Sequence, residues 1–376
     1  MSGRSTERAT CICDGNAPRN PPEKGPQTAD ASVVAWLRGT ASGGDAALFA
    51  AARATLERRI DRRVRMRGLL EFSNLCTCEC RYCGIRSSVP VARFTLSENE
   101  IVSAAVACRD AGFGSMTLQS GERRDSVFVE FVERCLRRIK RETKTSELPN
   151  GLGITLCVGE QTSDTYARWL DAGAHRYLLR VETSDADLFA RLHPRHQRFD
   201  RRVRALTTLK ALGYQLGTGV MIGLPGQTEE QLARDIQFFR DINADMIGMG
   251  PYLEAPGCPA DLRPDRGVSE RLLLSLRMIA ATRITLGDVN IASTTALQAI
   301  SPTGREAGLA AGANVLMPIV TPSDHRSAYQ LYAGKPCVDE DTATCVACTP
   351  ARAMRAGRPV LWNAWGDAPH AKGGPK

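Results

Sequence analysis

The sequence of 376 residues has no long apolar run and few aromatic side chains. No stretch approaches the roughly 18 consecutive apolar residues of a membrane-spanning helix. The first residues, MSGRSTERATCICDG, also lack the apolar core of a secretory signal. We therefore expect a cytoplasmic protein with no membrane partner. Aromatic residues make up only 6%, and the arginines behind the net charge of +8 are scattered. Without a basic stripe interleaved with aromatics, we expect no nucleic-acid partner.

Two common catalytic motifs are also missing. The glycine-rich stretch 217–226 lacks the lysine of a phosphate-binding loop, so we do not expect a nucleotide-phosphate site there. No Ser–His–Asp arrangement is found, and His175, His193 and His196 are interpreted as surface or hydrogen-bonding groups. Hydrophobic residues make up 43% and charged residues 24%, which is ordinary for a protein with a packed core.

Cysteine, by contrast, is abundant. Thirteen cysteines without an export signal indicate metal ligands or catalytic groups rather than disulfides. The spacing Cys76-x3-Cys80-x2-Cys83 places three thiols on one short loop and leaves Cys78 outside the pattern. Structural zinc sites and ordinary ferredoxin clusters usually take four protein ligands. Three cysteines therefore favour a 4Fe–4S cluster with one open iron, and a zinc site with a remote fourth ligand is the alternative.

A second cysteine motif lies near the C-terminus, Cys337-x7-Cys345-x2-Cys348. It again offers three thiols, either for a second metal centre or as a triplet that holds no physiological cluster. The remaining cysteines lack such spacing. We interpret the isolated ones as packing residues or free thiols: Cys108, Cys135 and Cys258. Cys157, which shares a strand face with Thr155, is a candidate for substrate contact.

Apolar segments alternate with amphipathic helical segments through most of the chain. Ser97 and Glu100, for example, form a capping-box pattern that predicts the start of one helix. Strict alternation of this kind predicts a parallel sheet, and eight units over about 250 residues favour a closed (β/α)8 barrel. The predicted strands are 67–73, 115–119, 152–158, 175–182, 214–223, 245–250, 289–294 and 314–319.

Polar residues lie at the C-terminal ends of these strands, where barrel enzymes carry their chemistry. Arg180 and Glu182 are two positions apart in an apolar strand and so share one face. Burying both is costly unless they pair or bind a ligand, so either a structural ion pair or a site is indicated. The other candidates at strand ends are Gln119, Ser120, Thr155, Thr294 and Thr295.

Together with Tyr82 and the barrel, the first cysteine loop resembles the radical S-adenosylmethionine (SAM) superfamily. The resemblance narrows to the HydE-type maturases of FeFe-hydrogenase over residues 68–348. Biotin synthase and methylornithine synthase match these stretches less well. The segments that carry the resemblance include LLEFSNLC, LQSGE, AGAHRYLLRVET, MIGLPGQT, ASTTAL, GREAGLAAGANVLMP, YQLYAGK and CVDEDTATCVAC.

The resemblance implies a role for each matching residue. Cys76, Cys80 and Cys83 would hold the 4Fe–4S cluster. Cys337, Cys345 and Cys348 would hold an accessory 2Fe–2S or 4Fe–4S cluster. SAM would be bound by Tyr82, Gln119, Glu182, Arg202 and Met221, with Arg201 competing with Arg202 for its place. The catalytic residues lining the barrel would be Ser120, Thr155, Arg180, Thr294 and Thr295.

The implied reaction is cleavage of SAM to a 5′-deoxyadenosyl radical during assembly of the hydrogenase 2Fe subcluster. The substrate would be an Fe(CO)2(CN)–cysteine species from HydG, HydF would be a further partner, and ferredoxin or flavodoxin would donate electrons. A radical mutase or sulfur-inserting enzyme acting on an amino-acid-like molecule is an alternative, as is a non-catalytic iron–sulfur carrier. The predicted divisions are a disordered tail (1–30), a helical extension (31–66), the core barrel (67–286), a barrel completion (287–350) and a C-terminal tail (351–376).

Overall fold

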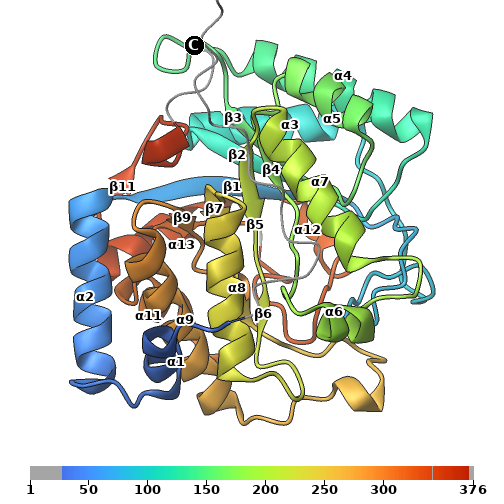
Figure 1. The fold of residues 1–376 in the computed structure, drawn as a ribbon. Coiled ribbons are helices and arrows are strands. Elements are labelled where there is room, and N and C mark those ends of the chain that lie inside the picture. The colour runs from blue at the N-terminus through green and yellow to red at the C-terminus, as the bar shows by residue number, and fades with distance from the viewer. Residues whose placement is uncertain (1–27, 341, 372–376) are drawn as a thin grey trace, which may run out of the picture.

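The computed structural model describes residues 28–340 and 342–371. Most of the predicted N-terminal tail, with Cys11 and Cys13, lies outside these residues. The described chain forms a barrel of parallel strands surrounded by helices (Figure 1). No helix in the described part combines the length and the apolar character that crossing a membrane requires.

Eight strands form the barrel in the order β10-β1-β2-β3-β4-β5-β7-β9. A parallel bridge between Ala292 and Val315 joins the last strand to the first and closes the ring. The predicted (β/α)8 barrel is thus confirmed. Its strands are β1 (Val64–Ser73), β2 (Ser115–Ser120), β3 (Gly153–Cys157), β4 (Arg176–Leu178), β5 (Gln215–Thr218), β7 (Met246–Ile247), β9 (Asn290–Ile291) and β10 (Val315–Leu316). A short pair, β6 (Met221–Ile222) and β8 (Gly250–Pro251), extends beyond β5 and β7.

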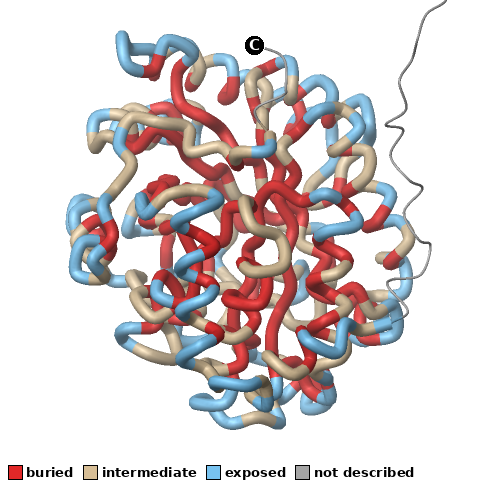
Figure 2. Tube along the Cα trace, turned by 60° about the vertical axis from the view of Figure 1, so that its left-hand side comes forward, coloured by how far each residue is buried: buried red, intermediate tan, exposed pale blue. Residues whose placement is uncertain are grey.

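Amphipathic helices cover the barrel, with their exposed faces outward and a buried centre (Figure 2). The predicted capping box opens α3, since Ser97 accepts from the Glu100 amide and Glu100 from the Ser97 amide. The covering helices are α3 (Glu98–Asp110), α4 (Ser126–Glu142), α5 (Ser163–Asp171), α6 (Ala186–Leu192), α7 (Phe199–Ala211), α8 (Glu229–Asp241), α9 (Val268–Leu286), α10 (Thr295–Ile300) and α11 (Gly304–Ala310). The predicted N-terminal extension forms α1 (Ala31–Arg38) and α2 (Gly44–Arg59).

Most strands are shorter than predicted, and two differences in boundaries bear on the site. Strand β1 begins at Val64, inside the stretch assigned to the helical extension. Its residues are all buried, and such a run has no alternation that would distinguish it from a buried helix segment. The segment predicted as one strand over 175–182 pairs as a strand only over Arg176–Leu178. Glu182 adds one isolated parallel bridge, to Val220, so Arg180 and Glu182 lie in the irregular segment that continues β4.

The predicted C-terminal tail is not a free tail over its described residues. Helix α13 (Thr342–Arg355) leads into β11 (Val360–Leu361), which pairs with the start of β1. The chain then crosses the N-terminal ends of the strands. There Trp365 Nε1 donates to the Gly151 carbonyl at 2.8 Å, and Asp367 pairs with Arg176. This segment therefore closes the end of the barrel opposite the predicted site.

Candidate active site

The first three-cysteine motif lies on the loop that follows β1. Cys76, Cys80 and Cys83 are partly exposed free thiols. The loop lies close to the end of β2, where the Glu122 amide donates to Cys76 Sγ at 3.4 Å. Gly121 allows this approach, because a Cβ atom there would come within 2.3 Å of the Leu75 carbonyl oxygen. The sequence spacing and the fold together place three thiols at the C-terminal end of the barrel.

The surroundings of these thiols fit a cationic iron cluster. Burial raises the pKa of Cys83 to about 12, and burial followed by the neighbouring Cys83 raises the pKa of Cys80. Metal ligands must be thiolates, so these sites need positive charge to deprotonate. Cys78 falls outside the spacing but lies close to the other thiols, since its thiol contacts that of Cys76. Gln197 contacts two of these thiols: its Nε2 donates to Cys78 Sγ at 3.0 Å, and its Oε1 accepts from Cys80 Sγ at 3.3 Å. The residues present thus suit a 4Fe–4S cluster held by the three spaced cysteines.

Beside this loop, Glu182 and Arg180 form an ion pair with 2.9 Å between Glu182 Oε2 and Arg180 Nη2. The Tyr82 hydroxyl donates to Glu182 Oε1 at 3.4 Å. Glu182 is buried, yet its Oε2 has no aligned hydrogen bond among the described residues, and neither does Arg180 Nε. Glu182 also has a φ of 66°, a left-handed conformation that is strained for a residue other than glycine. Unsatisfied, strained polar groups of this kind are typical of a ligand site.

Arg201 and Arg202 occupy different environments although both contact Glu160. Arg202 is buried, and its Nε donates to Glu160 Oε1 at 2.7 Å. Its Nη1 donates to the Arg180 carbonyl, which links it to the segment after β4. The Arg201 side chain is 50% exposed and reaches Glu160 at 3.3 Å from outside. The structure therefore brings Arg202 toward the interior and leaves Arg201 at the surface.

The other predicted SAM-binding residues lie around the same end of the barrel. Gln119 Nε2 donates to the Tyr329 hydroxyl at 3.3 Å. Met221 packs in a small apolar cluster, and Tyr82 packs against that cluster. Neither contact was predicted, because the partners are far apart in the sequence.

The predicted catalytic residues do not share a single environment. The Thr295 hydroxyl lies 2.7 Å from the Tyr332 hydroxyl, and the neighbouring Thr294 donates to the Met249 carbonyl at 3.4 Å. Ser120 is buried and donates to the adjacent Gly121 carbonyl at 2.7 Å. Ser120 is the last residue of β2, and the two threonines follow β9, so all three hydroxyls lie at the C-terminal end of the barrel.

Thr155 differs from these hydroxyls. It is fully buried within β3, and its Oγ1 accepts from Arg176 Nε at 3.0 Å. Arg176 in turn pairs with Asp367 from the C-terminal segment. The Thr155 hydroxyl is therefore tied to the closed end of the barrel. Cys157, two residues farther along, is partly exposed.

The accessory cysteines are brought together only in part. Cys337 and Cys345 lie close to each other, with Glu340 beside them. Cys348 is not a member of that group. The isolated Cys108 and Cys135 are buried in the main apolar core, which confirms their interpretation as packing residues.

Several residues near the site were not singled out from the sequence. The segment 329–335 was noted for its resemblance alone, yet Tyr329, Tyr332 and Lys335 all reach the barrel. His193, interpreted from the sequence as a surface or hydrogen-bonding group, is buried and lies within hydrogen-bond distance of the Phe189 carbonyl. Its ring lies edge-on to Tyr82, and burial lowers its pKa to about 3. No spacing rule links these positions to the first cysteine loop. Only the fold reveals them.

Comparison with known proteins shows which family the chain belongs to. Residues 70–239 match the model of the Radical SAM superfamily. The [FeFe] hydrogenase maturase subunit HydE of Thermotoga maritima is 40% identical over 303 residues, which is 80% of this chain and 83% of that protein. The 3-methylornithine synthase of Methanosarcina acetivorans is 26% identical over 74% of this chain and 75% of its own length.

Solved structures show the same fold. Methylornithine synthase (PylB) superposes with a TM-score of 0.74 at 22% identity, covering 90% of this chain and 96% of that one. HydG from Carboxydothermus hydrogenoformans superposes with a TM-score of 0.66 at 18% identity, covering 80% of this chain and 70% of that one. These two likenesses concern the fold alone. From the extent of its identity with the Thermotoga protein, the chain belongs to the HydE family of radical SAM enzymes.

Proposed function

We propose that this chain is a maturase that uses SAM in assembling the 2Fe subcluster of [FeFe] hydrogenase. The observation that carries the proposal is the three-thiol loop beside the Glu182–Arg180 ion pair, in which Glu182 Oε2 and Arg180 Nε lack aligned hydrogen bonds among the described residues. Held by Cys76, Cys80 and Cys83, a 4Fe–4S cluster would supply the electron that cleaves SAM to methionine and a 5′-deoxyadenosyl radical. A ferredoxin or flavodoxin would deliver that electron.

The protein's own residues would bind and orient the SAM. Glu182 offers a buried carboxylate for the amino group, with Tyr82 holding its other oxygen. Arg202 joins the same network through Glu160 and the Arg180 carbonyl. Gln119 and Met221 would complete the site. Because all of these groups lie on a packed barrel, little ordering is needed when SAM binds.

The substrate we propose is an Fe(CO)2(CN)–cysteine species delivered by HydG, with the product passing toward HydF. Arg180 is a cation suited to an anionic substrate, and the hydroxyls of Ser120, Thr294 and Thr295 lie at the same end of the barrel. Thr155 would contribute from the opposite end of the barrel, through its hydrogen bond with Arg176. The radical must be held about 3–3.5 Å from its target to react selectively, which requires a dry, shaped interior.

The likeness to methylornithine synthase favours a second candidate, a radical rearrangement of an amino-acid-like molecule on the same scaffold. The two candidates share SAM cleavage and differ in substrate. An accessory metal site is compatible with both candidate functions. The spacing of Cys337, Cys345 and Cys348 supports an accessory metal site in either case.

An anaerobic assay tests the proposal. The protein is reconstituted with iron and sulfide, reduced and given SAM, and 5′-deoxyadenosine is measured by mass spectrometry. We expect product from the parent protein and none from Cys80→Ala. Adding the HydG product should then give turnover of the iron species. SAM cleavage that ignores this species but responds to an amino acid would favour the second candidate, and Cys80-independent product would refute both.

A further inference from the structure

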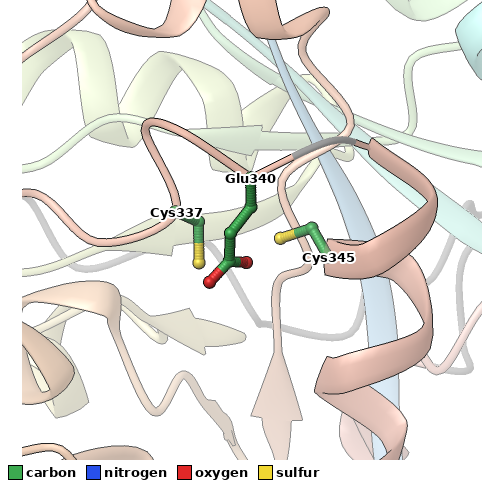
Figure 3. Close-up of side chains that lie close together, drawn as sticks. All are labelled: Cys337, Glu340 and Cys345. Carbon is green, nitrogen blue, oxygen red and sulfur yellow. The ribbon is translucent and has the colours of Figure 1, made fainter.

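The accessory motif brings together a carboxylate that its cysteine spacing does not include. Cys337 Sγ, Cys345 Sγ and a carboxylate oxygen of Glu340 all lie within 4.8 Å of one another (Figure 3). The three side chains come from the loop before α13 and from the first turns of that helix. In Figure 3 the Cys345 sulfur points toward the Glu340 carboxylate. Cys348 is outside this group, and its thiol contacts the Arg352 guanidinium.

The backbone around this group is held in place by a buried arginine. Arg326 Nη1 donates to the carbonyl oxygens of Cys337 at 2.9 Å and of Glu340 at 2.7 Å. Cys337 has a φ of 64°, a conformation that costs about 1–3 kcal/mol for a residue other than glycine. Such strain persists only where the surroundings enforce it, and here Arg326 ties both ends of the turn. The loop is therefore preorganised around the two ligands that it carries.

A second buried arginine, Arg305, has two donor nitrogens without a hydrogen-bond partner among the described residues. Arg305 is 1% exposed, and its Nε and Nη2 atoms have no hydrogen-bond partner within the described ranges. Its charge interacts favourably with Cys337 and Cys345. Leaving guanidinium donors buried and unsatisfied is expensive unless an anionic group accepts from them. Two thiolates and a carboxylate around a divalent ion leave one net negative charge, which a single arginine neutralises.

We propose that Cys337, Glu340 and Cys345 bind one zinc ion, with a fourth position open and Cys348 not a ligand. Zinc takes sulfur at about 2.3 Å and carboxylate oxygen at about 2.0–2.2 Å, so ligands of one tetrahedral ion are close neighbours. The three ligand atoms here are that close. Thiolates bound to different irons of a cluster need not be. A cluster on all three spaced cysteines would also need Cys348, which lies outside this group.

The proposed zinc site is connected to the barrel through the chain segment that precedes it. The loop that provides Cys337 follows directly on the segment with Tyr332 and Lys335, which contact Thr295 and Glu71. A metal ion that fixes the loop would thus help to position this segment. The inference concerns the accessory site alone and does not depend on the proposed substrate.

Cobalt serves as an optical probe for the test. The full chain carries Cys76→Ser, Cys80→Ser and Cys83→Ser to remove the catalytic thiols, and circular dichroism checks its fold. Cobalt is titrated and then displaced by zinc, and thiolate-to-cobalt absorption is recorded. We expect equal binding in the Cys348→Ser variant, loss in Cys345→Ser, and at least about tenfold weaker binding in Glu340→Gln.

The cluster interpretation predicts the reverse pattern. Binding that requires Cys348 and ignores Glu340 would overturn the zinc site. So would an iron–sulfur spectrum that is lost in the Cys348→Ser variant after reconstitution. If the background triple variant does not fold, elemental analysis of the purified parent chain decides instead. We expect about one zinc per chain that persists in Cys348→Ser and disappears in Cys345→Ser, and zinc absent from the parent chain would refute the proposal.

Discussion

Lys335 and Glu71 form an ion pair between the C-terminal segment and the interior of the barrel. Lys335 Nζ lies 2.5 and 2.6 Å from the two carboxylate oxygens of Glu71. Both side chains are buried, and Lys335 also donates to the Tyr329 carbonyl at 2.8 Å. The pair joins β1, which precedes the cysteine loop, to the segment that carries Tyr329 and Tyr332.

Removing only one partner of this ion pair should lower the stability of the fold. The Lys335→Met variant leaves the Glu71 carboxylate buried without a counter-charge, so we expect a loss of about 3–5 kcal/mol in the free energy of unfolding. The Lys335→Met/Glu71→Leu variant should recover much of that loss. Urea unfolding measures both, and exposed Lys144→Met is the control, expected within about 0.5 kcal/mol of the parent. A Lys335→Met loss no larger than this control would show that the pair is not an energetic link.

Two substitutions at Glu182 should distinguish the role of its carboxylate in SAM cleavage from the effect of its strained backbone on stability. Glu182→Ala and Glu182→Gly both remove the carboxylate, so we expect neither protein to cleave SAM. The φ of 66° is easy for glycine and strained for alanine, so Glu182→Gly should be the more stable by about 1 kcal/mol. The 5′-deoxyadenosine assay and thermal unfolding are measured on the same preparations. Cleavage retained in either variant would contradict the SAM assignment.

Arg201 and Arg202 form a matched pair of test sites on one helix with one shared partner. We expect Arg202→Lys to weaken SAM binding at least about tenfold, because a lysine cannot serve both Glu160 and the Arg180 carbonyl with a planar fork. Arg201→Lys should bind SAM like the parent, since its side chain is half exposed. Equilibrium binding of SAM to the reconstituted proteins gives both values. Equal losses of SAM affinity in the two variants, or a larger loss in Arg201→Lys, would contradict the assignment of Arg202 to the SAM site.

His175 should make the fold sensitive to acid. Burial, followed by the neighbouring Arg176, lowers its pKa to about 4, although the 3.1 Å contact between His175 Nε2 and Asp367 Oδ1 opposes this. Its ring also stacks on Trp365. Below pH 6.5 the unfolded chain takes up a proton that the folded chain excludes, so stability falls from about pH 6.5 toward pH 4. The contribution is at most about 3 kcal/mol.

The His175→Gln variant isolates this effect. It removes the titrating ring and should flatten the pH dependence of the unfolding free energy between pH 6.5 and 4. Urea unfolding at several pH values is compared for the parent and the variant. Parallel curves would mean that His175 does not carry the effect. His193, whose pKa is also lowered by burial, remains in both proteins and cancels in the comparison.

Much of the barrel and of the first cluster site could be predicted. Alternation of strands and helices identified the eight units because each carries its own periodicity. Cys76, Cys80 and Cys83 were identifiable because their ligand spacing is local. The end of regular pairing at Leu178 and the left-handed φ of Glu182 were not predicted, because the apolar sequence around them does not mark where a strand stops. The paired Arg180 and Glu182 were anticipated as charges that burial would force together.

Local spacing and periodicity by themselves therefore determined the barrel, its three-thiol loop and the end at which chemistry would occur. Tertiary structure alone decided that Arg202 rather than Arg201 turns inward, and that Glu340 rather than Cys348 joins Cys337 and Cys345. It also decided that the C-terminal residues close the barrel through Asp367 and Trp365. The physical reason is that a sequence pattern specifies which face of an element is buried. The partner across that face depends on how distant segments pack.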